Sequence, residues 1–192
     1  VRKHLLQKLS DHGGHIGPNL GMVEATVALH YVFNSPIDKM VFDVSHQSYA
    51  HKMLTGRKDA FLNPAEYDEV SGYTEPSESE HDQFVVGHTS TSVSLACGLA
   101  KGRDLKGGKE NVIAIIGDGS LSGGEALEGL DMAAELDTNI IIVVNDNQMS
   151  IAETTADCTK TCNCCARQTA GHNATCSRQW GWTMCMWATE TT

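Results

Sequence analysis

The stretch that decides the fold is "NVIAIIGDGSLSGGEALEGLDMAAELDTNIIIVVNDN", which runs from Asn111 to Asn147. Two short apolar runs, residues 111–116 and 139–144, flank a segment whose apolar residues recur at helical spacing. Apolar strands that alternate with helices indicate a parallel sheet with helices on both faces. We therefore predict an α/β fold.

Segments outside this stretch continue the alternation, and the 192 residues suffice for one domain with a sizeable core. The predicted elements are helices over 1–11, 22–34 and 46–57, loops over 13–21 and 63–82, a strand over 39–45, and a strand, loop and helix within 83–105. In the helix predicted over 122–137, Leu127, Leu130 and Ala134 can share the inner face.

Charge and hydropathy exclude several classes of partner. The formal net charge of −10 disfavours binding to nucleic acid or to an anionic membrane. No apolar run approaches the roughly 20 residues that span a bilayer, and the start of the sequence lacks a signal-peptide pattern. We expect a cytoplasmic protein.

The amino-acid composition of the chain changes near residue 153. Residues 1–153 contain one cysteine, Cys97, and no tryptophan, whereas residues 154–192 contain six cysteines, three tryptophans and no Leu, Ile, Val, Phe or Tyr. A segment without those apolar types cannot form an ordinary core. We predict a domain over 1–153 and a disordered tail over 154–192.

Oxygen-bearing side chains follow both apolar runs. Asp118 follows the first strand and Asn147 the second, so neighbouring parallel strands would bring them to one edge of the sheet. A carboxylate, an amide oxygen and a backbone carbonyl suit Mg²⁺ or Ca²⁺ rather than zinc. The small residues after Asp118 and the following helix N-terminus would accommodate a diphosphate. A glycine turn followed by an Asx turn is the structural alternative.

Four separated motifs carry a family resemblance. They are "GGHIGPNLG" (13–21), "FDVSHQSYAHKMLTGR" (42–57), "VGHTSTSVSLACGLAKG" (86–102) and "NDNQMSIAE" (145–153). Together with the GDG-to-NDN spacing, they resemble the thiamine-diphosphate enzymes of the transketolase class. Within that class they are most similar to the 1-deoxy-D-xylulose-5-phosphate synthase family, over roughly residues 1–153.

This resemblance implies thiamine diphosphate and Mg²⁺ as cofactors, with a defined set of residues. The implied residues are Asp118, Asn147 and the Met149 carbonyl for Mg²⁺; Gly119, Ser120 and Asn147 for the diphosphate; His46, Gly87, His88 and Thr89 for the rest of the cofactor; and His15 for the substrate. His15 and His46 would be catalytic, since a loop histidine can donate a hydrogen bond or move a proton near neutral pH. A local structural hydrogen bond is the alternative role for each.

The resemblance also implies an activity. Family members are two-carbon transferases that join pyruvate, with loss of CO₂, to glyceraldehyde 3-phosphate in isoprenoid biosynthesis, and they act as homodimers. The half of the cofactor site that holds the pyrimidine ring and its glutamate has no counterpart in this sequence. We therefore expect an incomplete N-terminal portion that is inactive alone.

The cysteine-rich tail has two explanations. With suitable codons, one added base after the codon of Glu153 turns "TTADCTKTCNCCAR" into "NHGGLYKNLQLLR", which is similar to the family's continuation. A single-base loss near codon 154 would thus account for the tail. Alternatively, the cysteines could bind zinc together with a histidine, through Cys158, Cys162, Cys164, Cys165 and His172.

Two alternative functions remain open at this stage. One is a transketolase-like N-terminal subunit that pairs with a separate pyrimidine-domain chain. The other is a non-catalytic, metal-binding fragment that uses the tail. Two further residues receive structural predictions: Cys97 should pack in the core, and His51 should lie on a helix surface.

Overall fold

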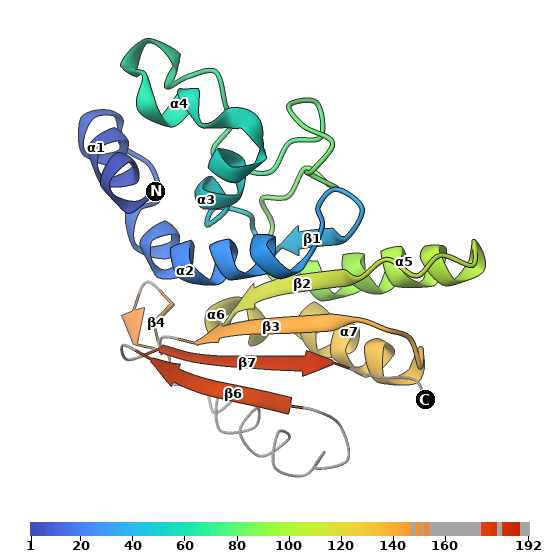
Figure 1. Cartoon of the computed structure of the whole chain (residues 1–192). Helices are drawn as coiled ribbons and strands as arrows, with labels where there is room; N and C mark the ends of the chain where they lie inside the picture. Colours follow the sequence, from blue (N-terminus) through green and yellow to red (C-terminus); the bar gives the residue numbers. More distant parts are fainter. Residues whose placement is uncertain (147–148, 151, 154–173, 180–181, 189–192) are drawn as a thin grey trace. The chain divides into compact units, whose positions relative to one another are not determined.

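A computed structural model of the chain describes residues 1–146, 149–150, 152–153, 174–179 and 182–188 (Figure 1). The chain divides into two compact units. We call Val1–Asp38 with Val44–Gly87 the helical unit, and Lys39–Asp43 with His88–Thr192 the sheet unit. Each is described by itself. No helix among the described residues is both long and apolar enough to cross a bilayer.

The sheet unit is built on a five-stranded sheet and, among its described residues, three helices. Its strands are β1 (Lys39–Phe42), β2 (Val112–Gly117), β3 (Ile141–Asp146), β6 (Ala174–Gln179) and β7 (Trp182–Ala188); its helices are α5 (Ser92–Leu105), α6 (Asp118–Leu121) and α7 (Gly124–Glu135). The strand order is β1-β2-β3-β7-β6. Strands β1, β2 and β3 are parallel, whereas β7 runs antiparallel to both β3 and β6.

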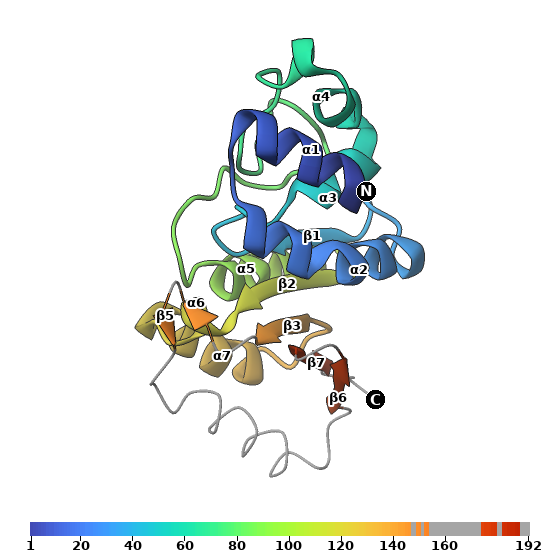
Figure 2. The ribbon, with the colours of Figure 1, turned by 90° about the vertical axis from the view of Figure 1, so that its left-hand side faces the viewer.

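Strand β2 is the centre of the parallel part, and this confirms the predicted α/β fold. Its residues 112–116 are each at most 1% exposed. A parallel strand with neighbours on both edges needs apolar side chains on both faces, which explains the unbroken apolar run. Helices α5 and α7 pack against each other and cover one face of the sheet (Figure 2).

The inner face of α7 differs from the predicted one. Leu127 is 48% exposed, and Ala134 is exposed as well, whereas the buried residues are Ala126, Gly129 and Ala133. Small residues face inward because α5 lies too close for leucine. The predicted face, with Leu130 at its partly buried edge, was therefore wrong.

Contact between α5 and α7 centres on Gly129. A Cβ atom there would lie 2.9 Å from the Ser94 Oγ and 3.2 Å from the Val93 Cβ. The Cys97 thiol, 4% exposed, donates to the Gly129 carbonyl over 3.6 Å. Burial also raises the pKa of the Cys97 thiol, as for an inert core cysteine. The predicted core position of Cys97 is confirmed.

The tail contributes two strands to this sheet. Residues 174–179 and 182–188 form β6 and β7, and β7 pairs with β3 from Ile141 to Asp146. In these two ranges the structure has strands where disorder was predicted. Residues 154–173 lie outside the described residues, as do the proposed zinc ligands Cys158, Cys162, Cys164, Cys165 and His172.

The helical unit packs short helices around one apolar cluster. Its elements are α1 (Arg2–His12), α2 (Ile16–Val32), α3 (Tyr49–Lys52), the π-helical η1 (Met53–Arg57), α4 (Asp59–Leu62) and the 3₁₀ turn η2 (Pro64–Glu66). The cluster consists of Leu5, Leu9, Val23, Tyr49, Ala60 and Phe61.

Two segments of the helical unit differ from the predicted elements. Helix α2 begins at Ile16, inside the loop predicted over 13–21, because Pro18 stands in the first turn, where no intrahelical N–H is needed. The strand expected after residue 83 is absent from the described residues. There the Phe84 carbonyl accepts from Thr74 Oγ1 and the Val86 carbonyl from Ser45 Oγ, so both bond side chains and not a neighbouring strand.

A buried ionic network joins α3 and η1 to the acidic segment 63–82. His51 is 0% exposed, and its Nε2 lies 3.0 Å from Asp82 Oδ1. Arg57 donates through two nitrogens to the same carboxylate, at 2.6 and 2.8 Å. The buried ammonium of Lys52 donates to Glu78 over 2.5 Å. The surface position predicted for His51 was therefore wrong, whereas the segment 63–82 is exposed or partly exposed, as expected of a loop, apart from buried residues such as Asp82.

His30 on α2 extends this network through one more hydrogen bond. Its Nε2 lies 2.9 Å from His51 Nδ1. Since Asp82 accepts from His51 Nε2–H, the Nδ1 of a neutral His51 must accept from His30. Burial, followed by repulsion from His51 and His81, lowers the pKa of His30 to about 4. Burial also lowers the pKa of His51.

These histidines make stability depend on pH. In the unfolded chain the His30 imidazole binds a proton near pH 6.5, whereas in the folded chain it stays neutral down to about pH 4. Acid therefore favours unfolding between these two pH values. The free energy of unfolding should fall as the pH drops from 6.5 to 4, by up to about 1.4 kcal/mol per pH unit for one proton. Urea titrations followed by circular dichroism at several pH values measure this slope.

The matched variants are His30→Gln, which removes the partly buried titrating group, and His4→Gln, at an exposed position on α1. His30→Gln should flatten the slope between pH 6.5 and 4, and His4→Gln should leave it as it is. Equal slopes in wild type and His30→Gln would contradict the role of His30.

Candidate functional site

A buried carboxylate organises the carboxyl edge of the sheet. Asp43 directly follows β1 and is 1% exposed. Its Oδ1 accepts from the Ser90 N–H and its Oδ2 from the Ser92 N–H, both over 2.9 Å. Ser92 is the first residue of α5, so Asp43 caps this helix and neutralises its positive end. Sequence reasoning gave this aspartate no role, although its position after a strand was the available signal.

Ser90 connects this cap to the turn that follows β2. Its hydroxyl donates to the Ser120 carbonyl over 2.7 Å, and its backbone has a φ of 72°. A Cβ atom on Gly123 would lie 2.0 Å from the Ser90 Oγ and 2.8 Å from its Cβ. The loop before α5 and the turn after β2 are thereby locked together.

The strand register sets Asp118 and the end of β3 at one edge of the sheet. Gly117 at the end of β2 pairs with Asn145 near the end of β3. Asp118 follows Gly117 at the start of α6 and is 5% exposed. The short strand β4 (Met149–Ser150), which pairs with β5 (Ala152–Glu153), contacts α6.

The donor chemistry at this edge fits Mg²⁺. Asp118 offers a carboxylate and Met149 a backbone carbonyl, so the donors are oxygen atoms. Asn147 lies outside the described residues, and the complete ligand set therefore stays a prediction. Among the described residues, no group of three or more His, Cys, Asp or Glu side chains could hold a metal ion.

Several residues predicted to contact the cofactor lie near the segments that Asp43 and Ser90 join. Gly119 and Ser120 belong to α6 and are partly exposed. His88 and Thr89 are exposed in the loop before α5, where His88 Nδ1 lies 2.6 Å from the Thr89 carbonyl. Gly87 is the last residue of the helical unit and is also exposed.

The two predicted catalytic histidines lie together in the helical unit. The His15 and His46 rings meet edge to face, with 5.3 Å between their centroids. His15 Nδ1 also lies 3.2 Å from the Tyr49 hydroxyl, and the ring packs edge-on against Tyr73 at 5.6 Å. Both histidines are partly exposed, so each can reach a ligand.

A strained turn leads into His46. Val44 and Ser45 both have positive φ values, 57° and 66°, which side-chain-bearing residues rarely adopt. Ser45 is held there by four hydrogen bonds: its hydroxyl donates to the Val86 carbonyl and accepts from the Thr74 N–H, and its carbonyl accepts from both the hydroxyl and the N–H of Ser48. Backbone strain of this kind persists where surrounding contacts over-determine it, commonly at ligand sites.

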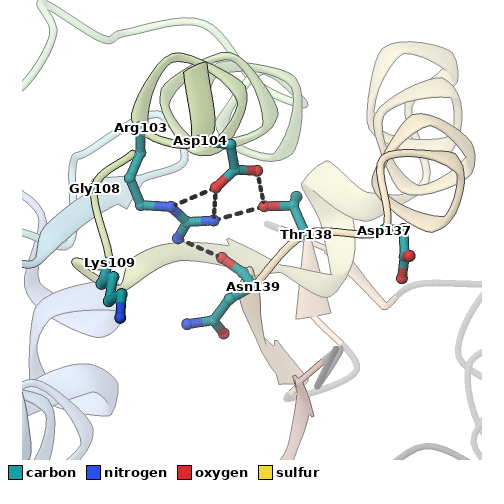
Figure 3. A pocket seen from close by; sticks show the side chains of 7 residues that line it. All are labelled: Arg103, Asp104, Gly108, Lys109, Asp137, Thr138 and Asn139. Atoms are coloured by element: carbon teal, nitrogen blue, oxygen red, sulfur yellow. Dashed lines mark hydrogen bonds and ion pairs between the residues drawn. The ribbon is translucent and has the colours of Figure 1, made fainter. Parts of the chain in front are cut away.

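A polar pocket of about 360 Å³ lies at the opposite edge of the sheet unit (Figure 3). It is lined by Arg103, Asp104, Gly108, Lys109, Asp137, Thr138 and Asn139. These residues precede β2 and β3, whereas ligands of parallel sheets bind beyond the carboxyl ends of the strands.

Arg103 in this pocket has a structural role. Its guanidinium is almost fully buried and donates to the carbonyls of Glu110 and Asn139, at 2.8 and 2.7 Å. It also donates to Asp104 and to the Thr138 hydroxyl. All of its nitrogens are occupied, so the guanidinium joins the end of α5 to the beginnings of β2 and β3 and cannot bind an anion.

Three parallel strands with packed helices, and buried carboxylates at the ends of β1 and β2, define an α/β domain. A family model described as 1-deoxy-D-xylulose-5-phosphate synthase matches residues 1–179. The chain belongs to the 1-deoxy-D-xylulose-5-phosphate synthase family.

Individual relatives agree with this assignment. The chain is 53% identical over 153 residues to 1-deoxy-D-xylulose-5-phosphate synthase of Caldanaerobacter subterraneus, covering 80% of this chain and 25% of that protein. The Geobacillus sp. synthase is 57% identical over 152 residues, 79% of this chain and 24% of the relative. The chloroplastic synthase 1 of Oryza sativa is 51% identical over 158 residues, 82% and 22% respectively.

The chain spans about a quarter of the length of these relatives. The pairwise similarities extend over 152 to 158 residues, whereas the family model reaches residue 179, within the cysteine-rich tail. The predicted base loss near codon 154 is not tested by these matches and stays a prediction.

The lock between Ser90 and Gly123 gives a stability prediction. Gly123→Ala should lower the free energy of unfolding by about 1–3 kcal/mol, because the new Cβ has no room beside Ser90. Adding Ser90→Gly should restore part of this loss, since it removes both clashing atoms and suits the positive φ. Urea midpoints followed by circular dichroism report both changes.

Gly124→Ala is the matched control, since a Cβ there meets nothing within 4 Å. It should be neutral or stabilising because alanine favours helices. If Gly123→Ala were as harmless as Gly124→Ala, the two loops would not be locked.

Proposed function

We propose that this chain is the cofactor-binding N-terminal part of a 1-deoxy-D-xylulose-5-phosphate synthase. The intact enzyme would take a two-carbon unit from pyruvate, with loss of CO₂, and join it to glyceraldehyde 3-phosphate for isoprenoid biosynthesis. The observation that carries this proposal is the family match over residues 1–179. A cytoplasmic location and a homodimeric assembly stay predictions.

The proposed cofactors are thiamine diphosphate and Mg²⁺. Asp118, Asn147 and the Met149 carbonyl would hold the metal, and Gly119 and Ser120 would contact the diphosphate. The contact between α6 and β4 supports the pairing of Asp118 with Met149. Thiamine diphosphate, when bound, supplies a nucleophilic carbon and an electron sink for two-carbon transfer.

The histidine pair would bind and orient the reactants. His46 would contact the cofactor, while His15 would donate a hydrogen bond to the substrate or move a proton at its Nε2. Their edge-to-face contact, with 5.3 Å between the ring centroids, supports a shared role, because both imidazoles could then contact the same small ligand. Gly87, His88 and Thr89 would lie against the cofactor.

The chain alone should show no synthase turnover, because the relatives are about four times longer and the residues that activate the aminopyrimidine ring are expected in the remainder. The test supplies pyruvate, glyceraldehyde 3-phosphate, thiamine diphosphate and Mg²⁺ and follows CO₂ release and deoxyxylulose 5-phosphate. The Caldanaerobacter synthase serves as the positive control. Product formation by the 192-residue chain above the enzyme-free background would contradict the expectation.

A chimera tests the proposed site in a complete enzyme. Residues 1–153 replace the corresponding segment of the Caldanaerobacter synthase, and the chimera should catalyse the synthase reaction. In this background, Asp118→Asn should raise the Mg²⁺ concentration for half-maximal activity at least about tenfold, equivalent to about 1.4 kcal/mol.

Asp131→Asn, at an exposed position on α7, is the matched control and should leave the Mg²⁺ requirement unchanged. A folded chimera without turnover would overturn the proposed activity. An active chimera with the same Mg²⁺ requirement in Asp118→Asn would overturn the metal assignment alone.

A further inference from the structure

Asn19 fastens the two histidine segments of the helical unit to each other. It lies on α2 and is 0% exposed. Its Nδ2 donates to the His15 carbonyl and to the His46 carbonyl, each over 2.7 Å. Its Oδ1 accepts from the Tyr49 N–H over 2.9 Å. One side chain therefore bonds the backbone beside both histidines.

Only an amide side chain satisfies this arrangement. Asparagine has two N–H donors and one carbonyl acceptor, and Asn19 uses all three. An aspartate would direct a carboxylate at two carbonyl oxygens, and an alanine would leave three buried backbone groups without partners. The residue thus fixes the backbone at His46 to the start of α2, although Asn19 precedes His46 by 27 residues.

Tyr49 completes the arrangement from the other side. Its N–H is the group that Asn19 accepts from, and its hydroxyl lies 3.2 Å from His15 Nδ1. A Cβ on Gly14 would lie 3.1 Å from this hydroxyl oxygen, and one on Gly72 would lie 3.4 Å from it. The two glycines leave the hydroxyl room in an otherwise buried position.

The Tyr49 hydroxyl also decides which His15 nitrogen carries the proton. Burial raises the pKa of Tyr49, so the hydroxyl keeps its proton at neutral pH. A phenol O–H is a stronger acid than a neutral imidazole N–H, so the stronger hydrogen bond runs from the hydroxyl to Nδ1. The imidazole proton then resides on Nε2, the nitrogen turned away from Tyr49.

We propose that Asn19 and Tyr49 are positioning residues for the histidine pair: Asn19 fixes the two backbones, and Tyr49 holds His15 in the Nε2–H tautomer. His15 thereby presents a donor and not an acceptor to its ligand. This inference rests on the proposed function, in which His15 and His46 face the substrate and the cofactor.

The first test reads the tautomer directly and needs neither cofactor nor turnover. The 192-residue chain is labelled with ¹⁵N-histidine, and two-bond ¹H–¹⁵N spectra are recorded above pH 7. In the wild type, His15 Nδ1 should resonate as a bare, acceptor nitrogen and Nε2 as a protonated one. Tyr49→Phe should move the two shifts toward each other, because the tautomers then mix.

Tyr31→Phe is the matched control, since Tyr31 on α2 is 91% exposed. It should leave the His15 shifts unchanged. Unchanged His15 shifts in Tyr49→Phe, or a wild-type spectrum that already shows mixed tautomers, would overturn the role of Tyr49.

The second test uses the chimera and separates positioning from folding. Tyr49→Phe and Asn19→Asp should lower kcat on the order of 10- to 100-fold with a smaller change in KM, as for a misplaced catalytic group. Asn19→Asp should also shift the ring resonances of both His15 and His46. Variants that lose stability while kcat and the histidine spectra stay as in the unsubstituted chimera would make both residues merely structural.

The two proposals fail differently. A chimera without turnover, combined with the expected spectra, would reject the synthase function and keep the histidine arrangement. An active chimera whose kcat and spectra ignore both substitutions would reject the positioning role and keep the function.

Discussion

The carboxyl edge of the sheet depends on the carboxylate of Asp43. This group is buried at the end of β1 and accepts two backbone N–H groups, from Ser90 and Ser92. Hydrogen bonds to a charged acceptor contribute about 1.5–3 kcal/mol each, and a buried N–H left without a partner is costly. Helix α5 can therefore begin in only one place relative to β1. The Ser90 hydroxyl also donates to the Ser120 carbonyl, so the turn after β2 is held in place relative to the start of α5.

Strand β2 supplies the second constraint. Its side chains are buried on both faces, so slipping by one residue against β1 or β3 would move each of them to the opposite face and disturb its packing. The register pairs Gly117 with Asn145 and sets Asp118 at the edge that Asp43 organises. A short loop after a deeply buried strand is thus placed as firmly as the strand itself.

Sequence patterns could predict those features that depend on local chemistry. The apolar runs of β2 and β3 and the oxygen-bearing residues after them follow from period and spacing, and both strands formed where expected. Patterns failed where a distant residue decides the outcome. Which face of α7 is buried depends on the close approach of α5 at Gly129. The spacing of apolar residues within α7 does not encode that approach.

The same limit explains the misplaced polar residues. His51 reads as a surface histidine because Asp82, the partner that allows its burial, lies 31 residues away in an acidic segment. Sequence patterns place Asn19 in a loop and give it no role, because two of its three hydrogen-bond partners are backbone carbonyls. Every residue type has such a carbonyl, so the sequence does not mark them. Residues such as Asp118 can be proposed for a site from sequence because their own chemistry suggests a role. Residues that act by holding backbone become visible only in the fold.

Polar fastening also has a physical consequence for the histidine segments. An apolar contact tolerates small slips, because dispersion and burial change gradually with distance. A buried amide with three fixed partners does not, because a slip leaves several groups unsatisfied at once. The Asn19 amide, the bonds that hold Ser45 in its strained turn, and the His51–Asp82 pair all belong to this second type. Such contacts add little net stability compared with an apolar core of equal volume. What they provide is a single arrangement of the backbone segments that they join, and a fixed orientation is what the roles proposed for His15 and His46 require.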